Sequence, residues 1–387
     1  MNCKALQDND LFYSRLEKDL STRRENNLYR ETRTAPDGFI DLSSNDYLQL
    51  RKHPAIIEGA EKALELYGTG SGASPLLTGF KPCHRELLDK LLAWKKKKFG
   101  MLFNSGFVAN QALLSHLPER NDLVLADRLI HHSIAQTLGR SKARFKRYPH
   151  LDLDILEREL SRSSQYDTVF VVTESVFSMD GDYPDLKRFA ELKKKFNFIW
   201  ILDEAHGVGV YGDTGAGLAE EMDVSSMVDV MIGTLGKALG SMGAYVLSDY
   251  EKIIEYLTNS SGEYIFSTFL CPSAAGAACS AIDHIAGNRE ESKLLREKSI
   301  EMRKALVSLG YNLIESDSQI IPVAIEDAGL ALKMSDYFFK EGVLIGAIRF
   351  PTVPRGKERL RLSMHSKITK EEFSKILNLF QRWKSKI

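Results

Sequence analysis

The sequence predicts an α/β protein in which a large domain with a mostly parallel sheet precedes a smaller α+β domain at the C-terminus. From about residue 98 to residue 287, short apolar runs alternate with amphipathic stretches. This pattern is typical of βα units whose strands are covered by helices on both faces. The length of 387 residues also exceeds the size at which one hydrophobic core stops growing, so a second domain is expected.

The expected strands of the large domain are the apolar runs at residues 123–125, 168–172, 198–202, 228–232 and 244–247. Before them, residues 11–28 have the spacing of an amphipathic helix, which is expected to lie against the main domain or a partner. Glycines at residues 68–72 and at Gly79 indicate loops. The charge runs at residues 95–98 and 193–195 are interpreted as solvated helix surface.

The C-terminal domain is expected to begin with a helix over residues 289–309. Its strands are expected at residues 319–325, 343–349 and 358–364, and its helices at about residues 330–340 and 370–384. Thr369 and Glu372 fit a capping box at the start of the last helix. The predicted division is an N-terminal helical segment at 1–47, a large domain at 48–288 and a small domain at 289–387.

Charge and cysteine content exclude several classes of function. Fifty-two basic residues balance fifty-two acidic ones, so no long-range field would attract nucleic acid or an anionic membrane. Cys3, Cys83, Cys271 and Cys279 are scattered and show no metal-ligand spacing, so we expect reduced thiols and no metal site. The N-terminus lacks the apolar core of a signal peptide, and the chain is expected in the cytoplasm.

Lys237 is the first candidate for a catalytic group. It follows the apolar run at residues 228–232 and lies among Gly233, Gly236, Gly240 and Gly243, which predicts a tight turn with room for a flat ring. A lysine that forms a Schiff base must lose its proton, and desolvation or nearby positive charge favours that loss. The alternative is an exposed lysine in a glycine-rich turn.

Asp203 ends the apolar run Phe-Ile-Trp-Ile-Leu, which has the character of a buried strand. A carboxylate at this end of a strand faces the ligand crevice of an α/β sheet. An acid there would keep the pyridine nitrogen of pyridoxal phosphate (PLP) protonated and so make its ring an electron sink. The alternative is an aspartate that caps the next turn. His206 follows in the same turn, where a lone histidine is more often structural.

A phosphate site and a carboxylate site complete the pattern. Ser105 and Gly106 precede an apparent helix that begins near Phe107, and helix N-termini bind phosphate; a Ser-Gly start is more often only a cap. Thr234 would place a hydroxyl on the same phosphate. Arg361 lies on an alternating strand and would bind the carboxylate of an amino acid, although an exposed strand face is equally consistent with the alternation.

These motifs occur together, in this order, in the α-oxoamine synthases, a family of fold-type I PLP enzymes that the chain resembles over most of its length. The resemblance rests on Ser44-Asn-Asp-Tyr-Leu48, Gly70-Ser-Gly-Ala-Ser74, Asn104-Ser-Gly-Phe107, Asp127-Arg-Leu-Ile-His131, Thr173-Glu-Ser-Val-Phe-Ser-Met-Asp-Gly-Asp182, Asp203-Glu-Ala-His-Gly207, the turn around Lys237, and the run from Pro351 to Arg361. It implies an aspartate aminotransferase-like fold with a seven-stranded sheet in the large domain.

The resemblance also implies roles for single residues. Lys237 would hold PLP and later remove the Cα proton of the substrate, Asp203 would pair with the pyridine nitrogen, and His131 would stack on the ring. His206 and Ser178 would lie by the ring oxygen. The catalytic residues are therefore expected to be Lys237, His131, Asp203 and His206.

The phosphate of PLP would be bound by Ser105, Gly106, Phe107 and Thr234. Ser267 and Thr268 would reach the phosphate of the neighbouring subunit's cofactor, so the resemblance implies a homodimer with shared active sites. The substrate would be bound by Asn45, Arg349, Thr352 and Arg361. The likeness is greatest to family members that join L-alanine to a pimeloyl thioester with loss of carbon dioxide.

Three residues depart from the pattern of the family. Pro75 stands where Gly-Ser-Gly-Ala-Ser is usually followed by arginine, Gln49 where glycine is common, and His132 where a small residue is usual. If the arginine of the family helps to admit the acyl chain or the thioester carrier, its absence here leaves the identity of the acyl donor open.

Other functions stay open at this point. Members of the same family that act as 2-amino-3-ketobutyrate ligase, 5-aminolevulinate synthase or serine palmitoyltransferase differ only in amino acid and acyl donor. A dinucleotide-binding oxidoreductase would need a Gly-x-Gly-x-x-Gly after a strand with an acidic residue about twenty positions later, and the sequence has none so placed. A non-enzymatic binding protein on this fold is the remaining alternative.

Overall fold

A seven-stranded sheet forms the centre of the large domain. The computed structural model describes residues 9–34 and 36–385. The strand order is β2-β8-β7-β6-β5-β3-β4. Within this sheet β8 is antiparallel to both of its neighbours, and the other neighbouring strands pair in parallel. The strands are β2 (Phe99–Phe103), β3 (Leu123–Asp127), β4 (Arg144–Tyr148), β5 (Val169–Glu174), β6 (Ile199–Asp203), β7 (Val230–Thr234) and β8 (Ala244–Ser248). The predicted mostly parallel seven-stranded sheet is confirmed.

Two strands of the seven-stranded sheet were not predicted. β4 has the sequence Arg-Phe-Lys-Arg-Tyr and is exposed or half-buried along most of its length. It forms one edge of the sheet, where strands need no continuous apolar run. β2 forms the other edge and directly follows the lysine run, which hid its start.

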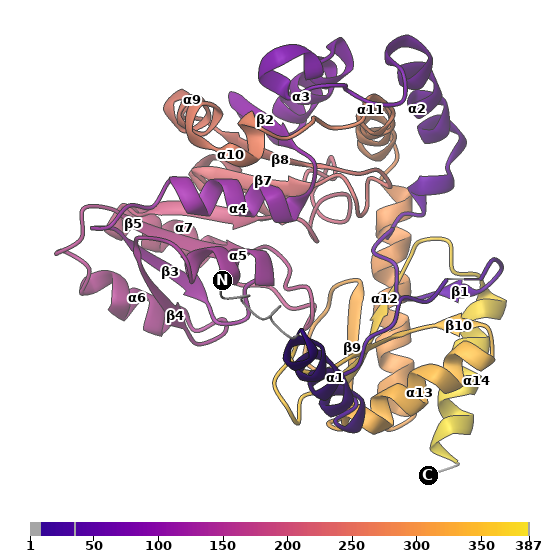
Figure 1. Cartoon of the computed structure of the whole chain (residues 1–387). Coiled ribbons are helices and arrows are strands. Elements are labelled where there is room, and N and C mark those ends of the chain that lie inside the picture. Colours follow the sequence, from indigo (N-terminus) through magenta and orange to yellow (C-terminus); the bar gives the residue numbers. More distant parts are fainter. Residues whose placement is uncertain (1–8, 35, 386–387) are drawn as a thin grey trace, which may run out of the picture.

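Helices cover the sheet as the βα pattern predicts (Figure 1). The helices of the large domain are α2 (Pro54–Tyr67), α3 (Pro82–Lys95), α4 (Gly106–His116), α5 (His132–Leu138), α6 (Leu153–Ser161), α7 (Leu186–Phe196), α8 (Leu218–Glu221), α9 (Glu251–Ser260), α10 (Gly262–Ile265) and α11 (Pro272–Gly287), with short turns η1 (Leu50–Lys52), η2 (Pro75–Gly79) and η3 (Ser225–Met227). α2 and α11 pack closely because Gly59 and Gly276 meet, and a Cβ on Gly276 would lie 2.2 Å from the Gly59 carbonyl oxygen.

In the predicted small domain, α12 (Glu290–Ser308) runs away from the seven-stranded sheet in Figure 1. β9 (Ile320–Ala324), β11 (Gly346–Ile348) and β12 (Arg359–Ser363) form an antiparallel sheet in the order β11-β12-β9. α13 (Ala328–Lys340) and α14 (Lys370–Lys384) pack beside it, and the capping box of Thr369 and Glu372 is confirmed.

The strand predicted at residues 343–349 is two strands. β10 (Val343–Leu344) pairs in parallel with β1 (Ile40–Asp41), whereas β11 pairs with β12. The break at Ile345 directs the two halves to different partners. Residues 40–41 therefore pair with the C-terminal part of the chain, although the domain boundaries after residues 47 and 288 stay predictions.

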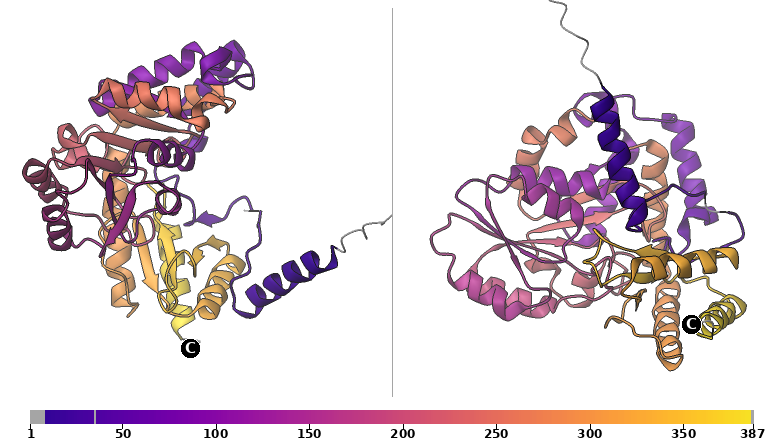
Figure 2. Two further views of the ribbon diagram at one scale, coloured as in Figure 1. Left: turned by 60° about the vertical axis from the view of Figure 1, so that its left-hand side comes forward. Right: turned by 60° about the horizontal axis from the view of Figure 1, so that its bottom comes forward.

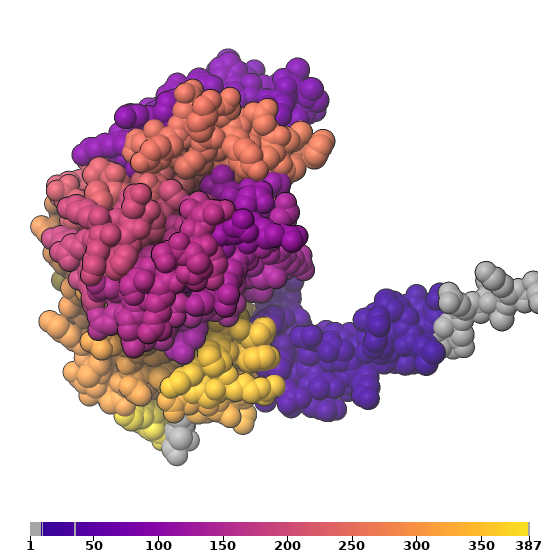
Figure 3. Space-filling view, turned by 90° about the vertical axis from the view of Figure 1, so that its left-hand side faces the viewer, coloured from indigo at the N-terminus to yellow at the C-terminus, as the bar shows by residue number. Residues whose placement is uncertain are grey.

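The N-terminal helix α1 (Asp10–Glu25) stands away from the rest of the molecule (Figures 2 and 3). It ends before the predicted residue 28. Its apolar side chains are exposed, with Leu11 83% exposed and Tyr13 58% exposed. The helix was predicted, but it does not bury its apolar side chains against its own main domain.

The charge run at residues 95–98 is solvated surface only in part: Lys96 and Lys98 are exposed, but the interpretation was wrong for Lys95 and Lys97. Lys95 is buried and its ammonium contacts the equally buried Glu204 at 2.7 Å and the Ala216 carbonyl. Lys97 is also buried and donates to the carbonyls of Ser225 and Val228 and to a carboxylate of Asp249. Ammonium groups are buried only when they are paired and hydrogen-bonded, and the sequence alone does not show the distant partners.

Candidate active site

Four strands of the sheet end side by side at one edge. Because β3, β5, β6 and β7 are parallel, their carboxyl ends meet there, and their last residues are Asp127, Glu174, Asp203 and Thr234. Glu174 lies directly opposite Asp203 in the ladder. Ligand crevices of open α/β sheets lie outside such an edge.

Lys237 lies in the turn between β7 and β8, and its amine is surrounded by buried groups. Gly240 and Gly243 adopt positive φ angles of 64° and 113°, which a residue with a Cβ rarely adopts. The Lys237 Nζ lies 2.7 Å from the His206 Nε2. Burial lowers the pKa of Lys237 to about 8, against the opposing effect of the Asp203 and Glu174 carboxylates. The alternative of an exposed surface lysine is therefore wrong.

His206 links Lys237 to two residues that are distant in the sequence, Tyr47 and Gln319. The Nδ1 of His206 lies 2.6 Å from the hydroxyl of the fully buried Tyr47, and the Gln319 amide donates to the His206 carbonyl at 2.8 Å. Burial, together with the nearby charges of Lys237 and Arg361, lowers the pKa of His206 well below its ordinary value. The imidazole is therefore neutral, and it can donate through one nitrogen and accept through the other.

Asp203 is held by two donors. The Asn110 amide donates to Oδ2 at 3.1 Å and the Ala205 backbone N–H donates to Oδ1 at 2.9 Å. Capping of its own turn and a role at the site therefore occur together. Asn110 also donates to Ser133, which contacts the His131 Nδ1 at 2.8 Å. The exposed His131 and the buried Asp203 are thus joined through a short chain of hydrogen bonds.

Glu174 is a buried carboxyl group that was not predicted. One of its oxygens accepts from the His131 backbone N–H, so it fixes the start of α5. Burial, together with the charge of Asp203, raises the pKa of Glu174 well above its ordinary value. Glu174 therefore retains a proton at a higher pH than a free glutamate.

The N-terminus of α4 faces β7. Ser105 caps the helix by accepting from the Val108 N–H at 3.3 Å, as the alternative interpretation of this Ser-Gly start expected. A Cβ on Gly106 would lie 3.9 Å from the Thr234 Cβ, so these two residues border one small space. The first backbone N–H groups of a helix need partners from outside the helix, and an anion in this space would supply them. Phe107, beside it, is exposed.

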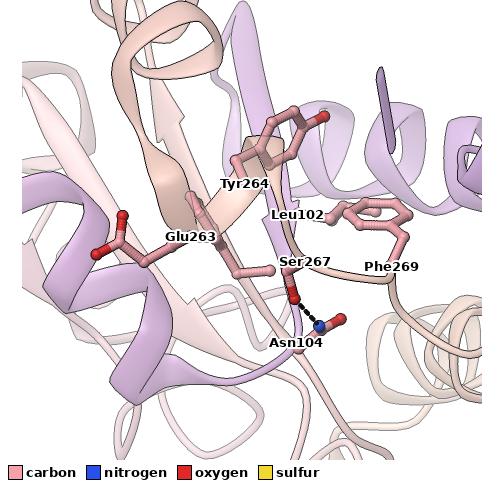
Figure 4. Close-up of a pocket in the computed structure, with 7 residues that line it drawn as sticks. Leu102, Asn104, Glu263, Tyr264, Ser267 and Phe269 are labelled. Atoms are coloured by element: carbon pink, nitrogen blue, oxygen red, sulfur yellow. Dashed lines mark hydrogen bonds between the residues drawn. The ribbon is translucent and has the colours of Figure 1, made fainter. Parts of the chain in front are cut away.

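Ser267 and Thr268 lie beside the start of α4 in their own chain. The Asn104 amide donates to the Ser267 hydroxyl at 3.0 Å and to the Thr268 carbonyl at 2.8 Å. Figure 4 shows Asn104 directed toward Ser267 in a small pocket that is also lined by Tyr264 and Phe269. Thr268 is exposed.

Arg361 reaches the site from the small domain. Its Nε donates to the Ser178 carbonyl at 2.6 Å, one terminal nitrogen donates to Ser363 at 2.6 Å, and the other donates to the Asn45 side chain at 3.2 Å. A guanidinium has five N–H donors, so two remain for a carboxylate. The strand is buried on both faces, so the alternative of an exposed strand face is wrong.

Arg349 and Thr352 form a separate group. Arg349 donates to the carbonyls of Asn27 and Tyr29, and Arg30 donates to the Thr352 hydroxyl at 3.5 Å. Burial and the charges of Arg30 and Arg33 lower the pKa of Arg349. No contact described for these residues joins them to Lys237.

The arrangement fits PLP. The amine of Lys237 is available for a carbonyl group, Asp203 offers a carboxylate to a ring nitrogen, and Gly106 leaves space for a phosphate at the start of α4. Arg361 offers two donors to an amino acid carboxylate. These groups together can activate the Cα of an amino acid.

Four residues of the site were missed by sequence reasoning, namely Tyr47, Asn110, Glu174 and Gln319. Stretches that carry the family resemblance contain Tyr47 and Glu174, and Asn110 follows another of them, Asn104-Ser-Gly-Phe107. A signal was therefore present for these three. Gln319 lies at the predicted start of a strand, and nothing in its neighbourhood marks it.

Comparison with known families identifies the class. The model of the aminotransferase class I and II family matches residues 37–380, so the chain belongs to that family. The 8-amino-7-oxononanoate synthase of Geobacter sulfurreducens is 38% identical over 361 residues, which cover 89% of this chain and 92% of that protein. Within the aminotransferase-like enzymes, the chain is thus a member of the 8-amino-7-oxononanoate synthase family.

Solved structures share the fold over nearly the whole chain. A serine palmitoyltransferase from S. paucimobilis with bound PLP and myriocin has a TM-score of 0.90 at 26% identity, covering 98% of this chain and all of that chain. The 8-amino-7-oxononanoate synthase of Francisella tularensis has a TM-score of 0.78 at 27% identity, covering 91% and 99%. The fold-type I architecture is confirmed.

The buried carboxyl of Glu174 gives a prediction on stability. Glu174→Gln keeps an oxygen that accepts from His131, whereas Glu174→Ala leaves that buried N–H without a partner and should cost about 1–3 kcal/mol. The pKa of Glu174 is raised above 4.5 in the folded protein, so the contribution of its proton to stability is complete below about pH 4.5 and is lost as the pH rises. In urea unfolding between about pH 4.5 and pH 8, the free energy of unfolding of Glu174→Gln should therefore rise relative to that of the wild type as the pH increases. A constant difference would contradict a raised pKa.

Proposed function

We propose that the chain catalyses the decarboxylative condensation of L-alanine with a pimeloyl thioester. The products are 8-amino-7-oxononanoate, carbon dioxide and the free thiol carrier, and the reaction belongs to biotin biosynthesis. The observation that carries the proposal is the buried Lys237 amine beside His206 and Asp203, in a chain 38% identical to a synthase of that name. We place the reaction in the cytoplasm, and no helix of the described residues could span a bilayer.

The cofactor is pyridoxal 5'-phosphate, which when bound supplies a conjugated ring that accepts the electron pair of the broken Cα–H bond. Asp203 would hold a proton on its ring nitrogen, and His206 and Ser178 would contact its ring oxygen. The N-terminus of α4 at Gly106 and Phe107 would bind its phosphate, together with Ser105 and Thr234. His131 would pack on the ring.

Arg361 and Asn45 bind the substrate, and Lys237 carries out the proton transfers. Arg361 and Asn45 bind the alanine carboxylate and so orient the Cα–H bond toward Lys237. The neutral amine of Lys237 takes the Cα proton, which a pKa near 8 permits close to neutral pH. The carbon–carbon bond then forms at the thioester carbonyl and the thiolate leaves. After carbon dioxide is lost, Lys237 returns a proton to Cα.

The far end of the acyl group is assigned to Arg349 and Thr352. A pimeloyl group carries a second carboxylate at its far end, and a guanidinium is a suitable partner for it. Arg30 and Arg33 lie close enough to Arg349 to lower its pKa. Arg33 pairs with Asp336, whereas among the described residues no carboxylate forms an ion pair with Arg30 or Arg349. A palmitoyl group ends in a methyl group and has no carboxylate to pair with an arginine. The cluster thus favours a dicarboxylic acyl donor.

The serine palmitoyltransferases are the main alternative, since their structures have the higher TM-scores. Backbone shape is shared by enzymes that act on different substrates, and function depends on side chains at the site. The sequence relatives and the arginine cluster therefore outweigh the difference in TM-score.

We also propose that the enzyme is a homodimer in which Ser267 and Thr268 reach the partner's cofactor. Phe266 is 85% exposed and Leu77 is 78% exposed. Large apolar side chains are stabilised by burial, so both would gain from contact with a partner. Their two segments are joined, because the Phe269 N–H donates to the Ala73 carbonyl and Ser71 donates to the Leu270 carbonyl. A second copy that covers this surface, here called the Leu77–Phe266 surface, would bring its own Ser267 and Thr268 with it.

A substrate comparison tests the proposed reaction. With PLP, the protein should release carbon dioxide and form an aminoketone from L-alanine and pimeloyl-CoA, and Lys237→Ala should lower kcat by several orders of magnitude. Glycine with acetyl-CoA and serine with palmitoyl-CoA should react at least about tenfold less efficiently, a difference of about 1.4 kcal/mol in transition-state binding. A preference for serine and palmitoyl-CoA would overturn the assignment.

A charge on the Leu77–Phe266 surface tests the homodimer. Leu77→Asp should convert the protein from dimer to monomer in light scattering and lower PLP retention, because a carboxylate would be buried without a partner. Val307→Asp introduces the same charge at a residue on α12 that is also exposed, and it should leave both properties unchanged. A wild type that is monomeric and fully active would contradict the shared site.

A further inference from the structure

His150 lies between two loops of the active site. Its Nδ1 is 2.8 Å from the Asp127 Oδ1, and its Nε2 is 2.8 Å from the Asp182 Oδ2. The ring packs edge-on against Phe177, with 4.6 Å between centroids. The two ring nitrogens thus face carboxylates from different segments, Asp127 at the end of β3 and Asp182 in the loop after β5. Neither the sequence patterns nor the proposed chemistry assigns His150 a role.

The first carboxylate organises the turn that carries His131. Asp127 is the last residue of β3, and it accepts from the backbone N–H groups of Leu129 and Leu151, each at 2.8 Å. The turn that follows leads directly to His131, whose own N–H is held by Glu174. The position of the His131 ring therefore depends on where Asp127 is held.

The second carboxylate belongs to the loop that binds Arg361. Backbone hydrogen bonds between Phe177 and Asp182, and between Gly181 and Phe177, close this loop on itself. Its Ser178 carbonyl accepts from the Arg361 Nε at 2.6 Å. A displacement of Asp182 would therefore move the group that orients the arginine expected to bind the substrate carboxylate.

The surrounding charges favour a protonated His150. Asp127 on β3, and Asp182 and Asp180 on the loop, face the imidazole, while Arg359 on β12 pairs with Asp180. Tyr148 on β4 adds no charge near neutral pH, because burial raises the pKa of its hydroxyl well above the ordinary value. Hydrogen bonds to Asp127 and Asp182 outweigh the cost of burial and raise the pKa of His150 to about 9.

The same residue types would also suit a metal ion, since His150, Asp180 and Asp182 place ligand atoms within 4.8 Å of one another. Both nitrogens of His150 already meet carboxylates, and Asp180 already pairs with Arg359. The positive charge that the carboxylates need is therefore supplied by two side chains, and the cluster is an ion-pair network.

We propose that the His150 imidazolium is a positioning residue that clamps the His131 turn to the Ser178 loop, and so aligns the cofactor side of the site with the carboxylate side. His150 acts through Asp127 and Asp182 and touches neither substrate nor cofactor. The consequence for catalysis rests on the proposed function, whereas the clamp itself is a property of the protein alone.

Two substitutions separate the halves of the clamp. The amide nitrogen of His150→Asn replaces Nδ1 and keeps the contact with Asp127, whereas that of His150→Gln replaces Nε2 and keeps the contact with Asp182. His150→Asn should therefore raise the KM for L-alanine severalfold with little loss of PLP. His150→Gln should instead weaken PLP retention severalfold, because the His131 turn is released.

The control is His284→Gln. His284 is as exposed as His150 and also contacts a carboxylate, Glu291, at 3.2 Å, but it lies on α11 away from both loops. This variant should keep the wild-type KM and PLP retention. If His284→Gln and both His150 variants have the same small effects, His150 has no positioning role.

Thermal unfolding at several pH values provides a readout without turnover. The folded pKa of about 9 is above the ordinary 6.5, so the stabilisation from His150 is complete below about pH 6.5 and is lost as the pH rises through about 9. The difference in Tm between wild type and His150→Asn should thus be constant at low pH and narrow above neutrality.

A Tm difference that does not change with pH would overturn the clamp, as would wild-type KM and PLP retention in both His150 variants. If the wild type makes no aminoketone, the proposed function fails, but the pH dependence of the Tm difference still decides whether the clamp exists.

Discussion

Burial of the Lys237 amine is the constraint on which the other groups of the site depend. Removal of water disfavours the charged form of every titratable group, so it lowers the pKa of Lys237 and His206 and raises that of Glu174. Burial therefore makes each of these three groups harder to charge than the same group in water. Asp203 accepts hydrogen bonds from the Asn110 amide and from the Ala205 backbone N–H, which fix its orientation. The site thus provides a basic amine and an oriented carboxyl group in the same crevice.

The fold produces this arrangement from segments that are far apart in the sequence. Parallel strands bring Glu174, Asp203 and Thr234 to one edge of the sheet without any local sequence that joins them. Arg361 comes from the small domain, and it reaches the same crevice because β12 is buried between its neighbours in the sheet and the Ser178 loop. The site therefore exists only when both parts of the chain are folded together, and the His150 network is one means of holding them in register.

Sequence reasoning identified residues whose neighbours along the chain reveal their surroundings. Lys237 was recognisable from its glycine turn, Asp203 from the apolar run before it, and Ser105 from the helix it begins. Lys95 was misread because Glu204, its partner, lies more than a hundred residues away, and a lysine run normally indicates surface. Glu174 was passed over for the same kind of reason, since its burial comes from strand pairing across the sheet. Periodicity predicted the helix α1 but not that its apolar side chains would be left exposed.

The central claim is that burial lowers the pKa of the Lys237 amine to about 8, so that it can accept a proton close to neutral pH. NMR titration of the ¹⁵N-labelled Lys237 side chain in cofactor-free protein, assigned with Lys237→Arg, measures its pKa directly. The midpoint should lie at about 8, and Asp203→Asn should lower it further because the Asp203 carboxylate stabilises the ammonium form. A midpoint near the ordinary 10.5, or one that Asp203→Asn leaves unchanged, would contradict the account.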